Sequence, residues 1–562
     1  MARRRLIYLP LGGAGEIGMN MYCYGWGAPG RERFILVDVG VTFPSMDGTP
    51  GVDLIMADPA WIEERRDRLE AIFITHAHED HVGALGILHE RLGRPPIHAR
   101  PFTGRHAARK LEERGGDPRA VRIAEPWPAT VKAGPFEVGF LPISHSIPEA
   151  SSLVIDTPAG RLIHTGDFKL DRTPVVGEPF DPELWAEVAR GRDGAGVLAL
   201  VCDSTNVFSP HPGRSEAVLA DPIAELVAEA PGMVVATTFA SNVARLRTLA
   251  EAGRRAGRAV VLLGRAMRQM LQTAIETGVV SDFPRVLSPD EAADVPREHL
   301  MLLATGSQGE RRAATAQLSQ GKHYGFTLSE GDLFLFSSKT IPGNEIAVAR
   351  VMNRLSEMGV DIVDGEDGRY HVSGHANRPD LAELHRLVRP KLVIPMHGEH
   401  RHLREHVKLA REGGFGAALA PNGTMLDLTS GTAEVAAHVE TGRVYLDGSA
   451  LFGAFDGIVL DRIRMAINGH VAVAVVIDEA DLPIDDAWVM IQGLAPKGRT
   501  GRALEEEVSE AVMTELARAK PRVLRDDDAL EREITRVVRR VVEAEIGKRP
   551  EVSVLISRLT LA

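Results

Sequence analysis

The amino-acid sequence predicts a multidomain protein of the α/β class. Several short apolar runs end in histidine or aspartate, a pattern typical of buried strands that deliver side chains to the edge of a sheet. A middle region then alternates strand-like with helical runs, as βαβ units around a parallel sheet do. With 562 residues the chain is longer than a single domain usually is.

Composition excludes several classes of protein. Hydrophobic residues make up 44% and charged residues 25% of the chain, as in an ordinary globular protein. The net charge of -12 argues against a general attraction to nucleic acid, so a nucleic-acid substrate would need a locally basic groove or bound cations. No apolar run reaches the roughly 18 residues of a membrane span, and the N-terminus is not a convincing signal peptide.

The chain contains only two cysteines, Cys23 and Cys202, which are far apart in the sequence. They argue against a disulfide scaffold and against a structural zinc site made of cysteines. They fit a reducing compartment. We therefore expect a cytoplasmic protein with no membrane partner.

The segment IFITHAHEDH, from Ile72 to His81, carries four potential metal ligands behind a strand-like run. On extended backbone His76 and His78 point to the same side, while Asp80 and His81 begin the next turn and can face a second ion. A polar surface loop is the alternative, but four ligand-type side chains directly behind a buried strand favour a metal site. The segment predicts two metal ions.

Gly13 to Gly18 formally matches the dinucleotide-binding pattern GxGxxG. That pattern requires a helix after the glycines, whereas residues 21–26 and 34–39 read as strands. We therefore interpret the glycines as a turn. Asp38, at the end of the second strand, is expected to support the metal site.

Three later strand ends supply further ligand candidates, His145, Asp167 and His397. A carboxylate such as Asp167 can bridge two cations, which a neutral imidazole cannot. His164, near Asp167 on the same strand but pointing the other way, is expected either to pack in the interior or to support the metal ligands. The predicted ligand sets are His76, His78, His145 and Asp167 for one ion, and Asp80, His81, Asp167 and His397 for the other.

The middle region places small polar residues after its strands, including Ser241 and Asn242 and the runs at 305–308 and 337–339. Such residues at the carboxyl ends of parallel strands suit phosphate binding, although they also form ordinary loops.

Six short motifs follow one another along the chain: THAHEDH (75–81), SH (144–145), TGD (165–167), DSTN (203–206), HVSGH (371–375) and PMHGE (395–399). In this succession the chain resembles ribonuclease J, a family in the β-CASP branch of the metallo-β-lactamase nucleases. The resemblance covers roughly residues 6 to 400, and no metal or catalytic position departs from the family pattern.

This resemblance implies a domain organisation. Residues 1–210 and 365–430 would form a metallo-β-lactamase αββα sandwich, and residues 211–364 an inserted β-CASP α/β domain. A linker at 431–465 would lead to a small α+β C-terminal domain at 466–562. A helix that packs on a core explains that domain's apolar spacing better than a dedicated RNA-binding helix does. The spaced residues are Leu530, Ile534, Val537, Val538, Val541, Val542 and Ile546.

The resemblance also implies an activity on single-stranded RNA, both 5′-to-3′ exonucleolytic and endonucleolytic, in RNA maturation and decay. Two divalent ions would be bound. Zn²⁺ is the expected metal and Mn²⁺ is the alternative. Asp80 would orient the attacking water, and His375, held by Asp203, would protonate the leaving 3′-oxygen. The implied substrate contacts are Ser241, Asn242, His371, Val372, Ser373, Gly374 and His375.

Family members commonly form homodimers or homotetramers, and some hold a structural Ca²⁺ beside an aspartate to which Asp447 would correspond. An RNA decay complex would be a further partner. Three alternatives stay open: a DNA-directed β-CASP nuclease, a small-molecule hydrolase of the lactamase type, and a noncatalytic RNA-binding paralogue. The intact ligand set argues against the last, and the long insertion argues against the second.

Overall fold

The computed structural model describes residues 3–45, 47–365 and 368–559. The chain forms two compact units, one made of residues 1–42 and 55–444 and the other of residues 43–54 and 445–562. Within the described residues, no helix has both the length and the apolar character needed to cross a membrane.

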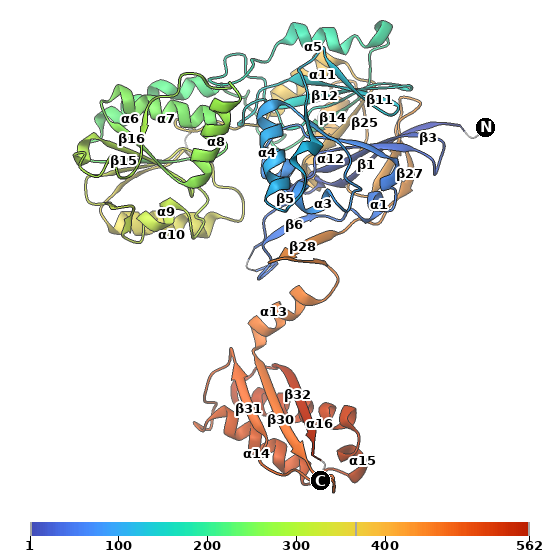
Figure 1. The fold of residues 1–562 in the computed structure, drawn as a ribbon, viewed down its shortest axis with the longest axis vertical. Coiled ribbons are helices and arrows are strands. Elements are labelled where there is room, and N and C mark those ends of the chain that lie inside the picture. The colour runs from blue at the N-terminus through green and yellow to red at the C-terminus, as the bar shows by residue number, and fades with distance from the viewer. Residues whose placement is uncertain (1–2, 46, 366–367, 560–562) are drawn as a thin grey trace. The chain divides into compact units, whose positions relative to one another are not determined.

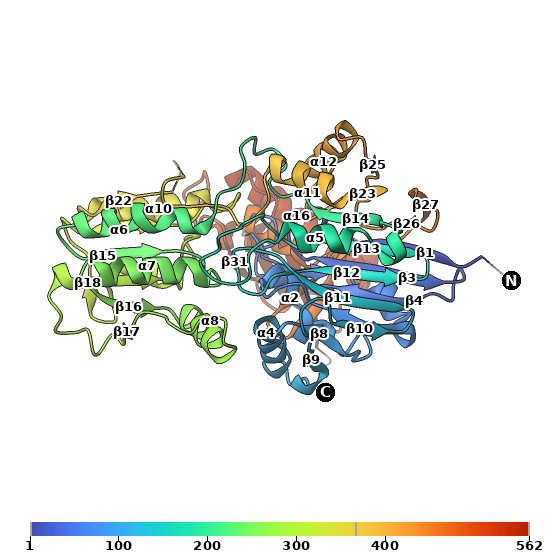
Figure 2. The ribbon, with the colours of Figure 1, turned by 90° about the horizontal axis from the view of Figure 1, so that it is seen from above.

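The first unit contains two large sheets and an inserted α/β domain (Figures 1 and 2). Its first sheet has eight strands, of which β1 and β3 pair antiparallel and β4, β7, β8 and β9 run parallel. In spatial order these are β27 (Glu434–His438), β26 (Thr424–Asp427), β1 (Arg5–Gly12), β3 (Met21–Gly27), β4 (Arg33–Val37), β7 (Leu69–Phe73), β8 (Ile97–Ala99) and β9 (Val121–Ile123).

The second sheet has seven strands and mixed direction. β13, β14 and β23 are parallel neighbours, so their carboxyl ends meet at one edge. β12 and β13 form the hairpin expected between Leu153 and Asp167. The spatial order is β10 (Thr130–Ala133), β11 (Phe136–Pro142), β12 (Ser151–Thr157), β13 (Gly160–His164), β14 (Val197–Asp203), β23 (Leu392–Met396) and β25 (Gly416–Ala417).

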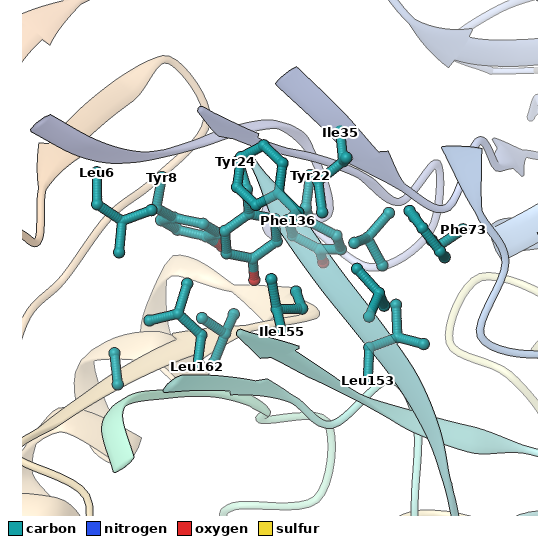
Figure 3. Close-up of a cluster of buried hydrophobic side chains, with 14 of the residues drawn as sticks. Leu6, Tyr8, Tyr22, Tyr24, Ile35, Phe73, Phe136, Leu153, Ile155 and Leu162 are labelled. Carbon is teal, nitrogen blue, oxygen red and sulfur yellow. The ribbon is translucent and has the colours of Figure 1, made fainter. Parts of the chain in front are cut away.

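A hydrophobic core fills the space between these two sheets (Figure 3). Tyr8, Tyr22 and Tyr24 from the first sheet face Leu153, Ile155 and Leu162 from the second. All six side chains are fully buried, because alternate residues of each strand point into the space between the two sheets.

Helices cover the outer faces of the two sheets (Figure 1). Trp185 of α5 and Leu384 of α11 pack with Cys202 of β14 in one buried cluster, which closes the outer face of the second sheet. This arrangement of helix, sheet, sheet and helix is the predicted sandwich. The helices are α3 (Leu85–Leu88) and α4 (Pro101–Glu112) on one side, with α5 (Pro182–Ala189), α11 (Arg378–Val388) and α12 (His400–Glu412) on the other.

The inserted domain has a six-stranded sheet whose strand pairs are all parallel. Figure 1 shows α6 and α7 on one face and α9 and α10 on the other. The predicted βαβ pattern is therefore confirmed. Its strands are β17 (Val286–Leu287), β16 (Ala259–Leu263), β18 (Leu300–Ala304), β15 (Val234–Thr237), β21 (Leu333–Phe336) and β22 (Asp361–Val363). Its helices include α6 (Ala220–Glu229), α7 (Val243–Arg255), α8 (Arg265–Glu276), α9 (Ala314–Leu318) and α10 (Glu345–Glu357).

The second unit contains a three-stranded sheet, β31 (Trp488–Gln492), β30 (His470–Ile477) and β32 (Glu551–Arg558), with α14 (Leu504–Leu516), α15 (Pro521–Leu524) and α16 (Asp527–Ile546). Alternate residues of β30 are buried against α14 and α16. In α16 the buried side chains are Leu530, Ile534, Val537, Val538 and Val542. The helix therefore packs on a core, as its spacing predicts. The segment expected as a linker holds β27, β28 (Arg443–Asp447), β29 (Ala450–Gly453) and the start of α13 (Ile458–Asn468).

The glycine-rich segment after β1 is a turn. The short strand β2 (Ala14–Gly15) and then β3 follow it, and no helix begins there among the described residues. Gly13, Gly15 and Gly18 have φ angles of 83°, 102° and 97°, which side chains other than glycine's rarely permit. The interpretation of GxGxxG as a turn is confirmed.

Candidate metal centre

The first group of possible ligands contains three histidines and an aspartate. The loop after β7 carries His76 and His78, and the second sheet contributes His145 and Asp167. His78 Nδ1 lies 3.1 Å from both His76 Nε2 and His145 Nε2. Asp167 Oδ2 lies 3.8 Å from the Nε2 atoms of His76 and His145. Four ligands about 2.0–2.1 Å from a zinc ion would be about 3.3 Å apart in a tetrahedron, so this group has the spacing of a tetrahedral site.

A second group adjoins the first through Asp167. His81 Nε2 lies 3.3 Å from Asp167 Oδ2 and 3.6 Å from Asp80 Oδ2. His397 Nε2 lies 3.3 Å from Asp80 Oδ2. Asp167 Oδ2 is thus within reach of both groups, which is the position of a bridging carboxylate.

Strand ends explain why residues so distant in sequence meet. β13, β14 and β23 are parallel: Asp203 is the last residue of β14, His397 directly follows β23, and Asp167 lies in the turn just after β13. His145 follows β11, which lies in the same sheet. Asp80 and His81 belong to the short helix α2 (Glu79–Val82), which follows β7 of the first sheet.

Most of the histidines are oriented through their second ring nitrogen. His81 Nδ1 lies 2.7 Å from Asp38 Oδ2, which also accepts a hydrogen bond from the Thr75 hydroxyl. Thr75 Oγ1 in turn lies 3.0 Å from His76 Nδ1. Such outer partners fix the ring orientation of metal-ligating histidines and raise their basicity. The expectation that Asp38 supports the site has this geometry behind it.

Burial and charge set the protonation of these groups. Burial lowers the pKa of His76 and His145 well below the ordinary value and that of His78 to about 4, so all three are neutral and able to bind a metal. Burial also opposes a charge on His81, but the carboxylates of Asp167, Asp80 and Asp38 raise its pKa to about 10. The second group therefore attracts positive charge strongly.

The residues present fit divalent cations. His397 Nε2 is buried and has no hydrogen-bond partner among the described residues, although it faces Asp80. A buried polar atom without a partner is costly, and a cation beside Asp80 would remove that cost. The donors are imidazoles and carboxylates with no thiolate, which both zinc and manganese accept.

His375 and Asp203 form a pair beside the two groups. His375 Nδ1 lies 2.8 Å from Asp203 Oδ2 and 3.9 Å from Asp167 Oδ2. Burial opposes the charged form of His375, but Asp203 and Asp167 outweigh it and raise its pKa. The side chain of His375 is 21% exposed and that of Asp203 only 1%. The raised pKa favours the protonated form of His375, and its partial exposure lets an incoming substrate reach it.

The loop that carries His375 is held by hydrogen bonds and belongs to no strand. The Asn206 side-chain amide donates to Ser373 Oγ at 2.8 Å and to Asn377 Oδ1 at 3.0 Å. The Gly374 carbonyl lies 2.6 Å from His145 Nδ1. Gly374 also allows a close approach, because a Cβ there would lie 2.6 Å from Ser146 Oγ.

The other residues expected to contact substrate line the junction with the inserted domain. Arg245 of α7 is fully buried and lies 3.4 Å from His371 Nδ1 and 3.5 Å from the Val372 carbonyl. The side chain of Val372 is buried, which leaves only its backbone for a substrate. Asn242 caps α7 by accepting a hydrogen bond from the Arg245 backbone, beside the partly exposed Ser241.

Asp447 lies in the second unit. It forms an ion pair with Arg462, and its neighbour Gly448 donates a backbone hydrogen bond to Asp53. The correspondence of Asp447 to a calcium ligand stays a prediction.

Sequence reasoning missed several supporting residues. Thr75 is the first residue of the THAHEDH motif, and Thr205 and Asn206 end the DSTN motif, so their places within these motifs are the signal that could have identified their roles. The Asn20 amide lies 3.0 Å from His81 Nε2. Neither Asn20 nor Arg245 belongs to a motif, and only the fold places them.

Comparison with known proteins decides the family. The metallo-beta-lactamase superfamily matches residues 26–225, and the beta-CASP domain of ribonuclease J matches residues 231–355. The Zn-dependent metallo-hydrolase RNA specificity domain matches residues 369–421, and the ribonuclease J C-terminal domain matches residues 457–559. Ribonuclease J of Sinorhizobium meliloti is 40% identical over 99% of this chain and 97% of its own length. The chain belongs to the ribonuclease J family.

Other ribonuclease J proteins agree. That of Mycobacterium tuberculosis is 37% identical over 83% of this chain and 82% of its own length, and that of Thermus thermophilus is 35% identical over 84% and 82%. A crystal structure of a protein of unknown function from Enterococcus faecalis shares the fold, with a TM-score of 0.52 at 16% identity over 75% of this chain and all of its own. As a ribonuclease J family member, the chain is a metal-binding hydrolase of phosphodiester bonds, with ribonuclease function.

Proposed function

We propose that this ribonuclease J family member degrades single-stranded RNA from the 5′ end and also cuts it internally, in RNA maturation and decay. The observation that carries the proposal is the position of His375. Its imidazole is paired with Asp203, lies beside the shared carboxylate Asp167 and is accessible from outside. A proton donor next to a predicted two-metal site is what hydrolysis of a phosphodiester requires.

Two divalent ions would be held by the two groups described above, and we propose Zn²⁺, with Mn²⁺ as the alternative. Such ions lower the pKa of a water molecule and neutralise the nonbridging oxygens of the phosphate. The carboxylates in the two groups supply a matching negative charge. The positive charge of the two bound ions would also explain how a chain with a net charge of -12 can accept a polyanion.

The residues of the chain would divide the remaining work. Asp80, whose side chain is 29% exposed, would accept a hydrogen bond from the attacking water and orient it. His375 would donate its proton to the 3′-oxygen as that oxygen leaves. Asp203 would hold the ring of His375 through Nδ1 and leave Nε2 free for the transfer.

The loop at 371–375 and the amino end of α7 would receive the RNA backbone. Ser373 and the backbone around Gly374 lie next to His375, while Ser241 and Asn242 lie at the start of α7 in the inserted domain. The amino end of a helix carries partial positive charge and suits a phosphate. A phosphate bound there would place the terminal nucleotide of a 5′-monophosphorylated strand at the metals.

We also propose a homodimer or homotetramer, action within an RNA decay complex, and a Ca²⁺ beside Asp447. Exposed apolar side chains in the second unit, such as Phe455 at 90% and Leu555 at 65%, suit contacts with other copies. A cytoplasmic location is proposed because Cys23 and Cys202 are both buried free thiols.

A labelled RNA assay tests the proposed activity. A short single-stranded RNA labelled at its 5′ end, with either a monophosphate or a triphosphate, is incubated with the enzyme in defined Zn²⁺ or Mn²⁺. We expect labelled mononucleotide from the monophosphate RNA and much slower release from the triphosphate RNA. An internally labelled, 5′-blocked RNA of the same sequence reports endonucleolytic cuts separately.

A single-stranded DNA of the same sequence serves as the control substrate. Cleavage of DNA with RNA left intact would contradict the proposal and favour a DNA-directed nuclease. Cleavage of neither, with two metal ions bound per chain, would favour a noncatalytic RNA-binding protein.

A further inference from the structure

A second cluster of metal-ligand side chains lies outside the centre described above. Cys202, His385 and His406 come from β14, α11 and α12, and their exposed fractions are 0%, 1% and 0%. Their ligand atoms all lie within 4.8 Å of one another. Cys202 points to the outer face of the second sheet, where it packs in the same cluster as Leu384 and Leu409. The cluster is therefore closed and apolar.

The nitrogens of this cluster are as close as those of the main metal centre. His385 Nε2 and His406 Nε2 are 3.1 Å apart, the separation that also joins His78 to His76 and His145. The two rings are nearly parallel, with centroids 5.1 Å apart and planes 14° apart, and their Nε2 atoms face each other. A cation bound by both nitrogens would take the place of the hydrogen atom that they share.

An outer partner orients one of these ligands. Ser204 Oγ lies 2.9 Å from His406 Nδ1, so the hydroxyl fixes the ring and leaves Nε2 for the cluster. This repeats the relation of Thr75 to His76 in the main centre. Burial lowers the pKa of both His385 and His406, which keeps their rings in the neutral form that binds metals.

We propose that Cys202, His385 and His406 form an additional metal site for a thiophilic d¹⁰ cation, Cu⁺ or Zn²⁺. Binding forms one metal–sulfur and two metal–nitrogen bonds and breaks the S–H bond of Cys202. The proton passes to solvent, and no electron is transferred. Thiolate and imidazole ligands together select these cations over the hard cations that carboxylates prefer.

Charge distinguishes the two cations. One thiolate and two neutral imidazoles carry a single negative charge, so Cu⁺ leaves the ligand set neutral, while Zn²⁺ leaves one buried positive charge that only the nearby carboxylate of Asp203 would offset. No carboxylate of the described residues belongs to this cluster, in contrast to the main centre. The sequence argued against a metal site made of cysteines. Our proposal departs from that expectation, because the fold brings two histidines from different helices to Cys202.

Thiolate-specific absorption tests the proposal on the full chain loaded with two Zn²⁺ ions. Under reducing, oxygen-free conditions one equivalent of Cu⁺ is added in competition with a chromophoric Cu⁺ chelator. In a parallel arm, Co²⁺ replaces Zn²⁺. If the site prefers Cu⁺, we expect the protein to withhold one equivalent of Cu⁺ from the chelator. If it prefers a divalent ion, we expect a third Co²⁺ ion to bind and to produce a thiolate-to-Co²⁺ charge-transfer band. The main centre contains no thiolate, so it cannot produce that band.

The chain supplies a matched control in Cys23, which is equally buried but belongs to no potential metal cluster among the described residues. We expect Cys23→Ser to keep the additional metal ion and Cys202→Ser to lose it. His385→Leu should lose the additional metal ion as well. Leucine is similar to histidine in volume and suits the apolar surroundings, so this variant replaces Cys202→Ser in the test if Cys202→Ser does not fold. Equal metal binding and absorption in Cys202→Ser, His385→Leu and the wild type, or no additional ion in any of them, would overturn the proposal.

Discussion

The two parts of the proposed catalytic centre are held in different ways. The first part is the set of predicted metal ligands, which lie near strand ends in residues 76–167 and at His397, and buried partners such as Asp38 and Thr75 orient several of them. His375, which follows the insertion, lies in a loop fixed by Asn206 and by contacts to Arg245. We infer that the first part is specialised for holding metals and that the loop supplies proton transfer. The two functions should therefore be separable by mutation.

The largest effect is expected from Asp167→Asn, because Asp167 is common to both ligand groups. We expect metal content to fall and activity to drop by more than the roughly 10- to 100-fold that loss of an outer partner costs. Metal analysis after dialysis, with RNA cleavage measured on the same sample, checks this. Full activity with two bound ions would show that Asp167 is not the bridging residue.

His375→Ala should have the next largest effect. Loss of a general acid typically lowers the rate by about 10²- to 10⁴-fold. His375 lies outside the two predicted ligand sets, although its ring is close enough to Asp167, Asp203 and His397 to form a third group of possible ligands. Because we assign His375 to proton transfer, we expect metal content to stay at the wild-type level. Single-turnover cleavage at saturating enzyme measures the chemical step directly. A variant that binds RNA normally and cleaves it at the wild-type rate would contradict the assigned role.

Asp203→Asn should change the pH dependence of the reaction. Burial opposes the charge on His375 and Asp203 is the main cause that raises its pKa, so removal of this carboxylate lowers that pKa. A general acid acts only while protonated, so activity is lost as pH rises through its pKa. The alkaline limb of the pH–rate profile should therefore move to lower pH in the variant. If the alkaline limb stays at the same pH in the variant, a group other than His375 causes it.

The smallest effect on chemistry is expected at the junction with the inserted domain. Arg245 is fully buried and forms an ion pair with Glu216 as well as contacting His371. Arg245→Met leaves Glu216 as an unpaired buried charge, which typically costs about 3–5 kcal/mol of stability. The double variant Arg245→Met/Glu216→Leu should recover most of that loss. Denaturant unfolding of the variants gives the coupling, and additive losses would show that the pair is not coupled.

Sequence reasoning reached the α/β class, the inserted domain and the two ligand groups because each depends on a local pattern. Each strand that ends in histidine or aspartate can be recognised from its own short segment of sequence, and the sheet then brings these strand ends together. The residues that orient these ligands are a different case. Asn20 and Arg245 interact across long stretches of chain, and nothing in their own neighbourhoods marks them.

The fold also created one relation that local patterns concealed. Cys202 reads as an isolated buried thiol, and His385 and His406 read as members of two separate helices. Their proximity depends on how α11 and α12 pack on β14, which no spacing in the sequence encodes. Sequence motifs therefore predict sites at strand ends better than sites between layers.

One measurement tests the separation of functions most directly. Metal content and single-turnover RNA cleavage are determined together for His76→Ala and His375→Ala. We predict that His76→Ala loses metal and activity in parallel and regains activity when excess metal is added. His375→Ala should keep its metals and stay slow at any metal concentration. Rescue of His375→Ala by added metal would contradict the account, because it would make His375 a ligand and leave the proton donor unassigned.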